Sequence, residues 1–193
     1  MKFLLPVLVL MILSSCGIQS IPQQKNEVEA TMAEITNQYK RRADLIPNLV
    51  TTVKGFASHE KETLQGVVEA RAKATSIQID PKNMTTEKFQ EYRKAQGDLS
   101  MALGKLMSIT ENYPNLKADR NFLDLQAQLE GTENRITVAR NRYIESIKGF
   151  NNLVTVPPTS FVNSIFYGHG KMPQWDVAES EKAQNEKAPD VKF

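Results

Sequence analysis

Apolar residues near the start of the chain recur at alternating steps of four and three, the spacing of one face of a helix. The positions are Val28, Met32, Ile35, Tyr39, Ile46, Leu49, Val53 and Phe56, with Arg42 in the step between Tyr39 and Ile46. A face this regular is typical of a long helix packed lengthwise against other helices. We expect the helix to start near Asn26, an N-cap residue type, followed by Glu27 and Glu29 in its first turn.

Three further stretches show helical spacing. The second helix is predicted to follow Ser58 as its N-cap and to end before a loop over residues 77–84. The third helix is predicted to start at Thr85 or Thr86 and to end at Pro114. The fourth is predicted from about Asp119 to a stop at residues 156–158, which are Val-Pro-Pro.

Four amphipathic helices, two of them long, are best satisfied by an antiparallel bundle. With 193 residues, 40% of them apolar, the chain is long enough for one core, and only nine glycines occur. We therefore predict an all-α fold, an antiparallel four-helix bundle over residues 26–156 with a long kinked first helix. The 24 basic and 22 acidic residues nearly balance, which argues against a nucleic-acid-binding protein.

Pro47 lies in the interior of the predicted first helix. If Pro47 began a new helix, Ile46 would be its N-cap, and isoleucine has no side-chain acceptor. We therefore predict one kinked helix, in which the carbonyl of Ala43 loses its partner at a cost of about 3 kcal/mol. The proline either bends the helix around its neighbours or shapes a binding surface.

Arg42 takes a position where an apolar residue is expected. It has two interpretations, an internal ion pair that fixes helix register or an arginine that binds an anion, because a buried guanidinium needs a negative partner. If the first and fourth helices are antiparallel with matched ends, Arg42 falls near Ile136. We predict that it pairs with Glu133, Glu130 or Glu111.

The N-terminus resembles a bacterial lipoprotein signal. Lys2 precedes an apolar run over residues 3–13, and Leu13-Ser14-Ser15-Cys16 resembles a lipobox. The run is shorter than the roughly 20 residues that span a bilayer, and Cys16 is the only cysteine, so it has no disulfide partner within the chain. We predict a signal peptide over 1–15, a lipid on Cys16 and a tether over 16–25. The alternatives are an uncleaved anchor and a secretory signal with an incidental cysteine.

A lipid on Cys16 would hold the protein on the outer side of the cytoplasmic membrane. In a cell with two membranes, Gly17 rather than aspartate after the cysteine favours the outer membrane, facing the periplasm, by analogy with enteric sorting rules.

Residues 157–177 form a short apolar C-terminal segment. Its apolar residues at helical spacing are Phe161, Val162, Ile165, Phe166 and Tyr167. The segment is expected to pack on the bundle, with contact to lipid or a partner as the alternative, and Trp175 is expected to be packed or half-packed. Residues 178–193 are charged and poor in apolar residues, which predicts a disordered tail.

Three stretches resemble the signature of the bacterial LemA family. They are Arg41-Arg42-Ala43-Asp44-Leu45-Ile46-Pro47-Asn48-Leu49-Val50, Glu111-Asn112-Tyr113-Pro114-Asn115-Leu116-Lys117-Ala118 and Leu129-Glu130-Gly131-Thr132-Glu133-Asn134-Arg135-Ile136. The resemblance covers roughly residues 25–167. It implies a bundle of the bromodomain-like type in an envelope protein without an established catalytic activity. The family usually begins with a transmembrane helix, whereas this chain has a lipobox.

The chain shows no motif for catalysis, for a metal or for a cofactor. Neither His59 nor His169 stands at metal-ligand spacing from another histidine or a cysteine, and no nucleophile elbow or phosphate loop is present. We therefore expect no enzymatic activity, no cofactor and no metal.

The sequence favours a membrane-anchored helical scaffold that binds another envelope protein. The alternative is a bundle that binds or senses a small anionic or cell-wall-derived ligand near Arg42 and Pro47. The candidate structural or interaction residues are Arg41, Arg42, Asp44, Pro47, Asn48, Glu111, Glu130, Glu133, Asn134 and Arg140.

Overall fold

The computed structural model describes residues 4–80 and 85–175, and the side chains from residue 18 onward. Every regular element in this part of the chain is helical, which confirms the predicted all-α class. The elements are α1 Leu4–Phe56, α2 Lys61–Ser76, α3 Thr86–Thr110, α4 Pro114–Lys117, α5 Arg120–Thr155, α6 Thr159–Val162 and the π-helix η1 Asn163–Tyr167.

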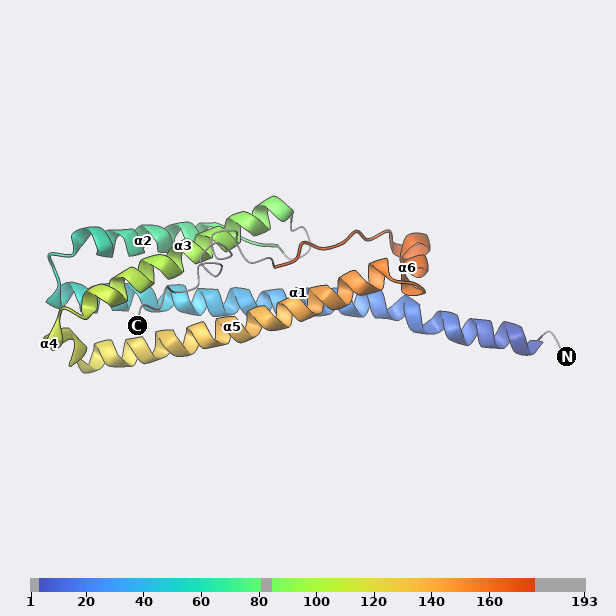
Figure 1. Cartoon of the computed structure of the whole chain (residues 1–193), viewed down its shortest axis with the longest axis horizontal. Coiled ribbons are helices and arrows are strands. Elements are labelled where there is room, and N and C mark those ends of the chain that lie inside the picture. The colour runs from blue at the N-terminus through green and yellow to red at the C-terminus, as the bar shows by residue number, and fades with distance from the viewer. Residues whose placement is uncertain (1–3, 81–84, 176–193) are drawn as a thin grey trace, which may run out of the picture.

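Two long helices, α1 and α5, lie antiparallel along the length of the molecule (Figure 1). Glu34 on α1 pairs with Arg142 on α5 at 2.8 Å, and Thr31 lies 2.9 Å from Ser146, oxygen to oxygen. The helices α2 and α3 cover the C-terminal half of α1, while α6 and η1 lie near the other end (Figure 1).

The buried apolar residues form two clusters along the bundle. One contains Ile46, Leu49 and Val53 of α1 together with residues of α2, α3 and α5. The other contains Ile21 to Tyr39 of α1, two aromatic residues of α3 and the C-terminal half of α5. Arg42 lies in the sequence between the two clusters, and every apolar residue of the predicted α1 face is buried except Phe56, which is 43% exposed.

The predicted start of the first helix near Asn26 is wrong. Helix α1 runs without interruption from Leu4 through Pro22 and Asn26. The physical reason is that α5 continues to Thr155 and gives the preceding turns a surface on which to pack: Ile21 is fully buried, and Gln24 Nε2 donates to the carbonyl of Ser146 at 3.0 Å. Residues 18–25 are therefore a docked part of α1.

Gly149 makes room for this docking. A Cβ at that position would lie 2.9 Å from Gln24 Nε2, closer than such atoms approach. The glycine of α5 thus allows the glutamine side chain to lie across the helix backbone and reach Ser146.

The other helix boundaries are partly as predicted. Thr85 and Asp119 are the N-caps of α3 and α5, and their side chains accept from the backbone N–H groups of Lys88 and Phe122. Ser58 is not the N-cap of α2: the helix starts after Glu60, whose side chain accepts from the Tyr113 hydroxyl at 2.9 Å. The chain turns at 57–60 because Ala57 continues the buried face of α1.

The chain between the long helices also differs slightly from the prediction. Helix α3 ends at Thr110, before Pro114, and Pro114 starts the short helix α4 at a position where its missing N–H costs nothing. Helix α5 ends before Pro157, as expected.

The C-terminal segment packs on the bundle. Val162, Tyr167, Met172 and Trp175 contact the apolar cluster that contains Ile21 to Tyr39. Gly168 closes η1 in the left-handed conformation, with φ 63°, which glycine adopts without strain. The predicted tail, 178–193, lies outside the described residues.

Candidate functional site

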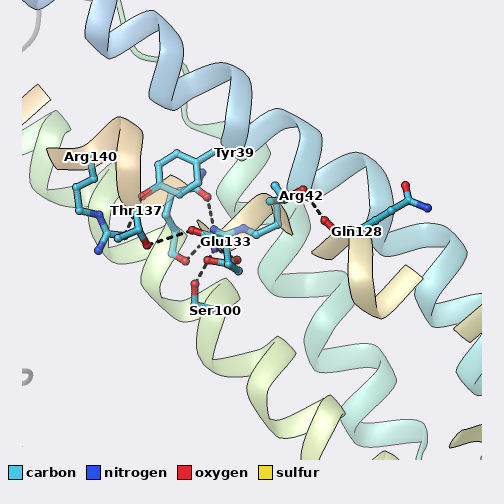
Figure 2. Close-up of polar contacts among 9 residues, drawn as sticks. Tyr39, Arg42, Ser100, Gln128, Glu133, Thr137 and Arg140 are labelled. Carbon is cyan, nitrogen blue, oxygen red and sulfur yellow. Dashed lines mark hydrogen bonds and ion pairs between the residues drawn. The ribbon is translucent and has the colours of Figure 1, made fainter. Parts of the chain in front are cut away.

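Arg42 lies at the centre of a polar layer that crosses the bundle between the two apolar clusters. We define the polar layer as Arg42, Gln96, Ser100 and Glu133, from α1, α3 and α5. Figure 2 shows Arg42 between Ser100 and Glu133. The guanidinium is 1% exposed. Its Nη1 donates to Ser100 Oγ at 2.7 Å and to Glu133 Oε1 at 2.9 Å. Its Nη2 donates to the carbonyl of Gln96 at 3.1 Å and to Gln96 Oε1 at 2.7 Å.

The prediction that Arg42 pairs with an acidic residue is confirmed, and the partner is Glu133. The side chain of Glu133 is 42% exposed, so its carboxylate joins the buried guanidinium to solvent. Glu111 and Glu130 are exposed and have other partners: Glu111 forms an ion pair with Lys117, and Glu130 accepts from Gln126 at 2.9 Å.

The space beside Arg42 is filled by side chains. The Tyr39 ring covers the guanidinium, with its centroid 5.0 Å from Cζ, in a cation–π contact. Two cavities, of about 380 and 510 Å³, lie elsewhere, one between α1 and residues 167–169 and one between α3 and the start of α5. Neither is lined by Arg42, so this conformation gives the ligand-binding interpretation of Arg42 no support.

Pro47 stands within the continuous helix α1, which confirms that the helix does not divide there. The carbonyl of Ala43 loses its usual N–H partner to the proline ring, and Arg71 of α2 replaces that donor: its Nε lies 2.7 Å from the Ala43 oxygen. The sequence predicted the freed carbonyl but not its new partner. Arg71 follows Leu64 and Val67 at steps of three and four, the spacing of one helix face, but nothing in the sequence links it to the carbonyl of Ala43.

Arg140 of α5, a candidate interaction residue, helps to hold the C-terminal segment. Its guanidinium carbon lies 5.0 Å from the centroid of the Trp175 ring, and Arg93 lies over the same ring at 5.2 Å. Phe89 and Tyr143 meet the ring edge-to-face at 5.3 and 6.1 Å. Arg140 Nη2 is also 3.4 Å from the Tyr39 hydroxyl, so the tryptophan site adjoins the aromatic cover of Arg42.

Two buried asparagines clamp the same segment through its backbone. Asn151 of α5 donates to the carbonyl of Met172 at 3.0 Å and accepts from its N–H at 2.8 Å. Asn163 of η1 makes the same pair of bonds with His169, at 2.9 and 3.0 Å. This role of the two asparagines is not evident from the sequence, because their partners are backbone groups. Asn151 lies 21 residues from Met172, and Asn163 lies 6 residues from His169.

The remaining candidate residues lie at the surface. Arg41, Asp44, Pro47 and Asn48 are exposed on α1, and Asn134 is exposed on α5. Arg41, Asp44 and Asn48 follow helical spacing, so they share one outward face. We call these three residues the α1 stripe. Cys16 lies in the part of α1 whose side chains are outside the description.

Two buried phenols of this region favour their neutral forms. Burial raises the pKa of the Tyr92 and Tyr143 phenols well above their usual range. At the far end of the bundle, the hydrogen bond to Glu60 raises the pKa of Tyr113. Within residues 4–80 and 85–175, no group of three or more His, Cys, Asp or Glu residues could hold a metal ion. No helix in that part of the chain is long and apolar enough to cross a membrane.

Comparison with known proteins identifies the family. The family model described as LemA family matches residues 31–193, most of the chain. The chain belongs to the LemA family. It is 24% identical to Protein LemA of Metamycoplasma hominis over 132 residues, which are 68% of this chain and 57% of that relative. The matched region of this LemA-family chain includes the polar layer, the α1 stripe and the tryptophan site.

Proposed function

We propose that this LemA-family protein is a lipid-anchored, non-enzymatic scaffold of the cell envelope that binds another envelope protein through the α1 stripe. The observation that carries the proposal is the division of the LemA-like stretch of α1. Its inward residues are buried in the apolar clusters or in the polar layer, whereas Arg41, Asp44 and Asn48 are exposed at the surface.

The stripe has the chemistry of a polar recognition surface. Arg41 offers a planar set of donors, Asp44 offers acceptors and Asn48 offers both, at one helical spacing. The helix beneath it is held by Arg42 on one side and by the Arg71–Ala43 bond on another. A stripe on a fixed helix presents these groups in a constant geometry, which reduces the ordering cost of binding.

Site-specific photo-crosslinking in cells tests the stripe. A photoreactive amino acid at Asn48 is expected to capture a discrete protein adduct, which the double substitution Arg41→Ser/Asp44→Ser should weaken. The same amino acid at Lys105, an exposed position on α3, is the matched control. Identical capture of lipid and abundant envelope proteins from both positions would refute the proposed partner surface.

The anchor has a separate test. The proposed lipid on Cys16 rests on the lipobox-like sequence, and cells grown with a fatty-acid probe are expected to label the protein. Cys16→Ala should abolish the label. An unlabelled wild-type protein, or a label that survives Cys16→Ala, would overturn the anchor without affecting the crosslinking result.

A further inference from the structure

We propose that α6 and η1 form a membrane-contacting surface, in which Phe161, Ile165 and Phe166 insert into the lipid headgroup region beside the acyl chains of Cys16. We call these three residues the apolar patch. The inference rests on the lipid anchor of the proposed function and adds a second, non-covalent contact with the same bilayer.

The apolar patch is the first observation. Phe161 is 64% exposed, Ile165 75% and Phe166 63%. Ile165 and Phe166 follow Phe161 by four and five residues. All three therefore lie on one side of a helix that changes from α-helical to π-helical turns. Val162, Asn163 and Tyr167 face the bundle instead. Large apolar residues gathered on one exposed side mark an interaction surface.

The position of the apolar patch indicates that a bilayer is the surface it contacts. The Tyr167 hydroxyl donates to the carbonyl of Ile18 at 2.8 Å, which joins η1 to the first described side chains of α1. Ile18 follows Cys16 by two residues, a rise of about 3 Å along a helix. An acyl chain on Cys16 would therefore enter the membrane next to the apolar patch.

The charge pattern supports the same occupant. The sequence has no acidic residue over 17–26 or over 146–175, the two stretches that meet at this end, whereas Lys25, Lys148 and Lys171 lie within them. The first acidic residues of α1, Glu27 and Glu29, follow Cys16 by roughly three to four helical turns. Glu29 does line a cavity with Tyr167 and His169, but a surface with few carboxylates and several lysines can still approach the phosphates of a bilayer.

The patch is also held rigidly. Asn163 clamps the turn at His169, and the ring of His169 stacks on Tyr167 with an interplanar angle of 12°. Asn151 fixes the chain again at Met172. A fixed apolar surface beside the acyl chains of Cys16 would add a second, non-covalent contact to the attachment.

The test uses the lipidated full-length protein in vesicles of phosphatidylethanolamine and phosphatidylglycerol. A polarity-sensitive fluorophore is placed at Ile165→Cys, and at Met101→Cys on α3 as the matched control, since Met101 is 68% exposed. We expect a blue shift of emission and quenching by nitroxide-labelled lipid at position 165, and neither effect at position 101. The additional changes Phe161→Ser and Phe166→Ser should abolish the blue shift.

Equal emission and equal quenching at the two positions would overturn the proposal. Excimer formation between pyrene groups at position 165 in lipid-free detergent would overturn it too, because the patch would then bind a second copy of the chain. The acyl mass on Cys16 is measured in the same samples. A protein without that mass would count against the anchor, whereas an acylated protein with an unshifted probe would count against the apolar patch alone.

Discussion

At the scale of single residues, the main feature is a charge placed inside an apolar bundle. Arg42 is 1% exposed, yet its terminal nitrogens have four hydrogen bonds and a carboxylate partner. Taking a guanidinium out of water is costly, and such a network offsets the cost only while every partner is present. The polar layer therefore favours the one register of α1, α3 and α5 that completes it.

The two partners of the ion pair should respond differently to substitution. Glu133→Gln leaves a buried guanidinium without a counterion, and we expect a loss of about 3 kcal/mol in the free energy of unfolding. Arg42→Met fills the site with an apolar chain and leaves Glu133, which is 42% exposed, in contact with water, so the loss should be smaller. Urea unfolding measures both.

Glu130→Gln is the control for this pair, since Glu130 is exposed and accepts a hydrogen bond from Gln126 of the same helix. It should change the free energy of unfolding by less than about 0.5 kcal/mol. Equal stability of Glu133→Gln and Glu130→Gln would contradict a structural role for the ion pair.

Tyr143 makes a second prediction at this scale. Its hydroxyl is buried and has no hydrogen-bond partner among the described residues. Tyr143→Phe should therefore leave the free energy of unfolding unchanged or raise it by about 1 kcal/mol. Tyr39→Phe, which removes the acceptor of Arg140, should lower it. Thermal unfolding of both variants at neutral pH checks the difference.

The same phenol should make the free energy of unfolding depend on pH. Burial raises the pKa of Tyr143 in the folded state above the usual value of about 10. Above pH 10 the unfolded chain loses this proton first, so the folded state holds more protons and its stability falls as the pH rises. Tyr143→Phe should make the alkaline fall shallower in a pH series of urea unfolding. An identical slope would contradict the raised pKa.

At the scale of elements, α1 and α2 are joined where α1 has lost a hydrogen bond of its own. Arg71 Nε donates to the Ala43 carbonyl that Pro47 leaves without a partner. The proline and the arginine should therefore be coupled. Arg71→Leu alone should cost about 1–2 kcal/mol, because it leaves a carbonyl unsatisfied.

A double-mutant cycle tests this coupling. Pro47→Ala restores the N–H that bonds to the Ala43 carbonyl within the helix, so Arg71→Leu should cost much less in that background. Arg93→Leu, a substitution at a site remote from Pro47 in the sequence, is the control and should cost the same in both backgrounds. Additive effects of Pro47→Ala and Arg71→Leu would show that the bond does not couple the helices.

Another prediction concerns the C-terminal segment. Trp175 is the single tryptophan of the chain, so its fluorescence reports the docking of residues 169–175. Asn151→Ala removes both bonds to Met172 and should shift the emission to the red while the helical circular dichroism stays unchanged. Asn152→Ala, at the neighbouring exposed position, is the control and should leave the emission wavelength unchanged.

The helices themselves could largely be predicted from the sequence, because the spacing of apolar residues repeats many times along a long amphipathic helix. The helical spacing of α1, α3 and α5, a start of α3 at Thr85 or Thr86 and a start of α5 near Asp119 were predicted from spacing and residue type. The predicted antiparallel arrangement left Glu133, Glu130 and Glu111 as possible partners of Arg42, and the structure shows that Glu133 is the partner. The start of α1 was not predictable in this way, since Ile21 and Gln24 are helical through tertiary contact with α5 and Asn26 is a good cap left unused.

The backbone-directed contacts were equally hidden. Asn151, Asn163 and Arg71 bind carbonyl or N–H groups of distant segments, and backbone groups carry no sequence signature. Trp175 was expected to be packed or half-packed, but the two arginines over its ring lie on different helices. Such sites depend on how elements meet, which local patterns do not specify.

At the scale of the whole molecule, the bundle is a rod with distinct ends. From Ile18 to Phe56, α1 is about 57 Å long. The apolar patch lies near the Ile18 end, and the start of α5 lies near the Phe56 end (Figure 1). With a lipid on Cys16 and the patch in the bilayer, the start of α5 would stand far from the membrane.

Energy transfer to an acceptor on the lipid headgroups tests this orientation. A donor at Ile165→Cys should transfer efficiently, whereas a donor at Leu123→Cys, exposed near the start of α5, should transfer weakly. Both variants must keep the thermal stability of the parent protein. Equal transfer from the two donors would indicate a rod that lies flat on the membrane.

The docking of residues 18–25 onto α5 has a consequence for any binding partner. With the acyl group on Cys16, almost no slack chain separates the bilayer from the packed rod, so the height of each surface residue is set by helix rise. In an upright rod Arg41 would stand about 35 Å above Ile18. A membrane-embedded partner with short external loops could not reach that level, and a suitable one must project a folded or extended portion at least that far from the lipid.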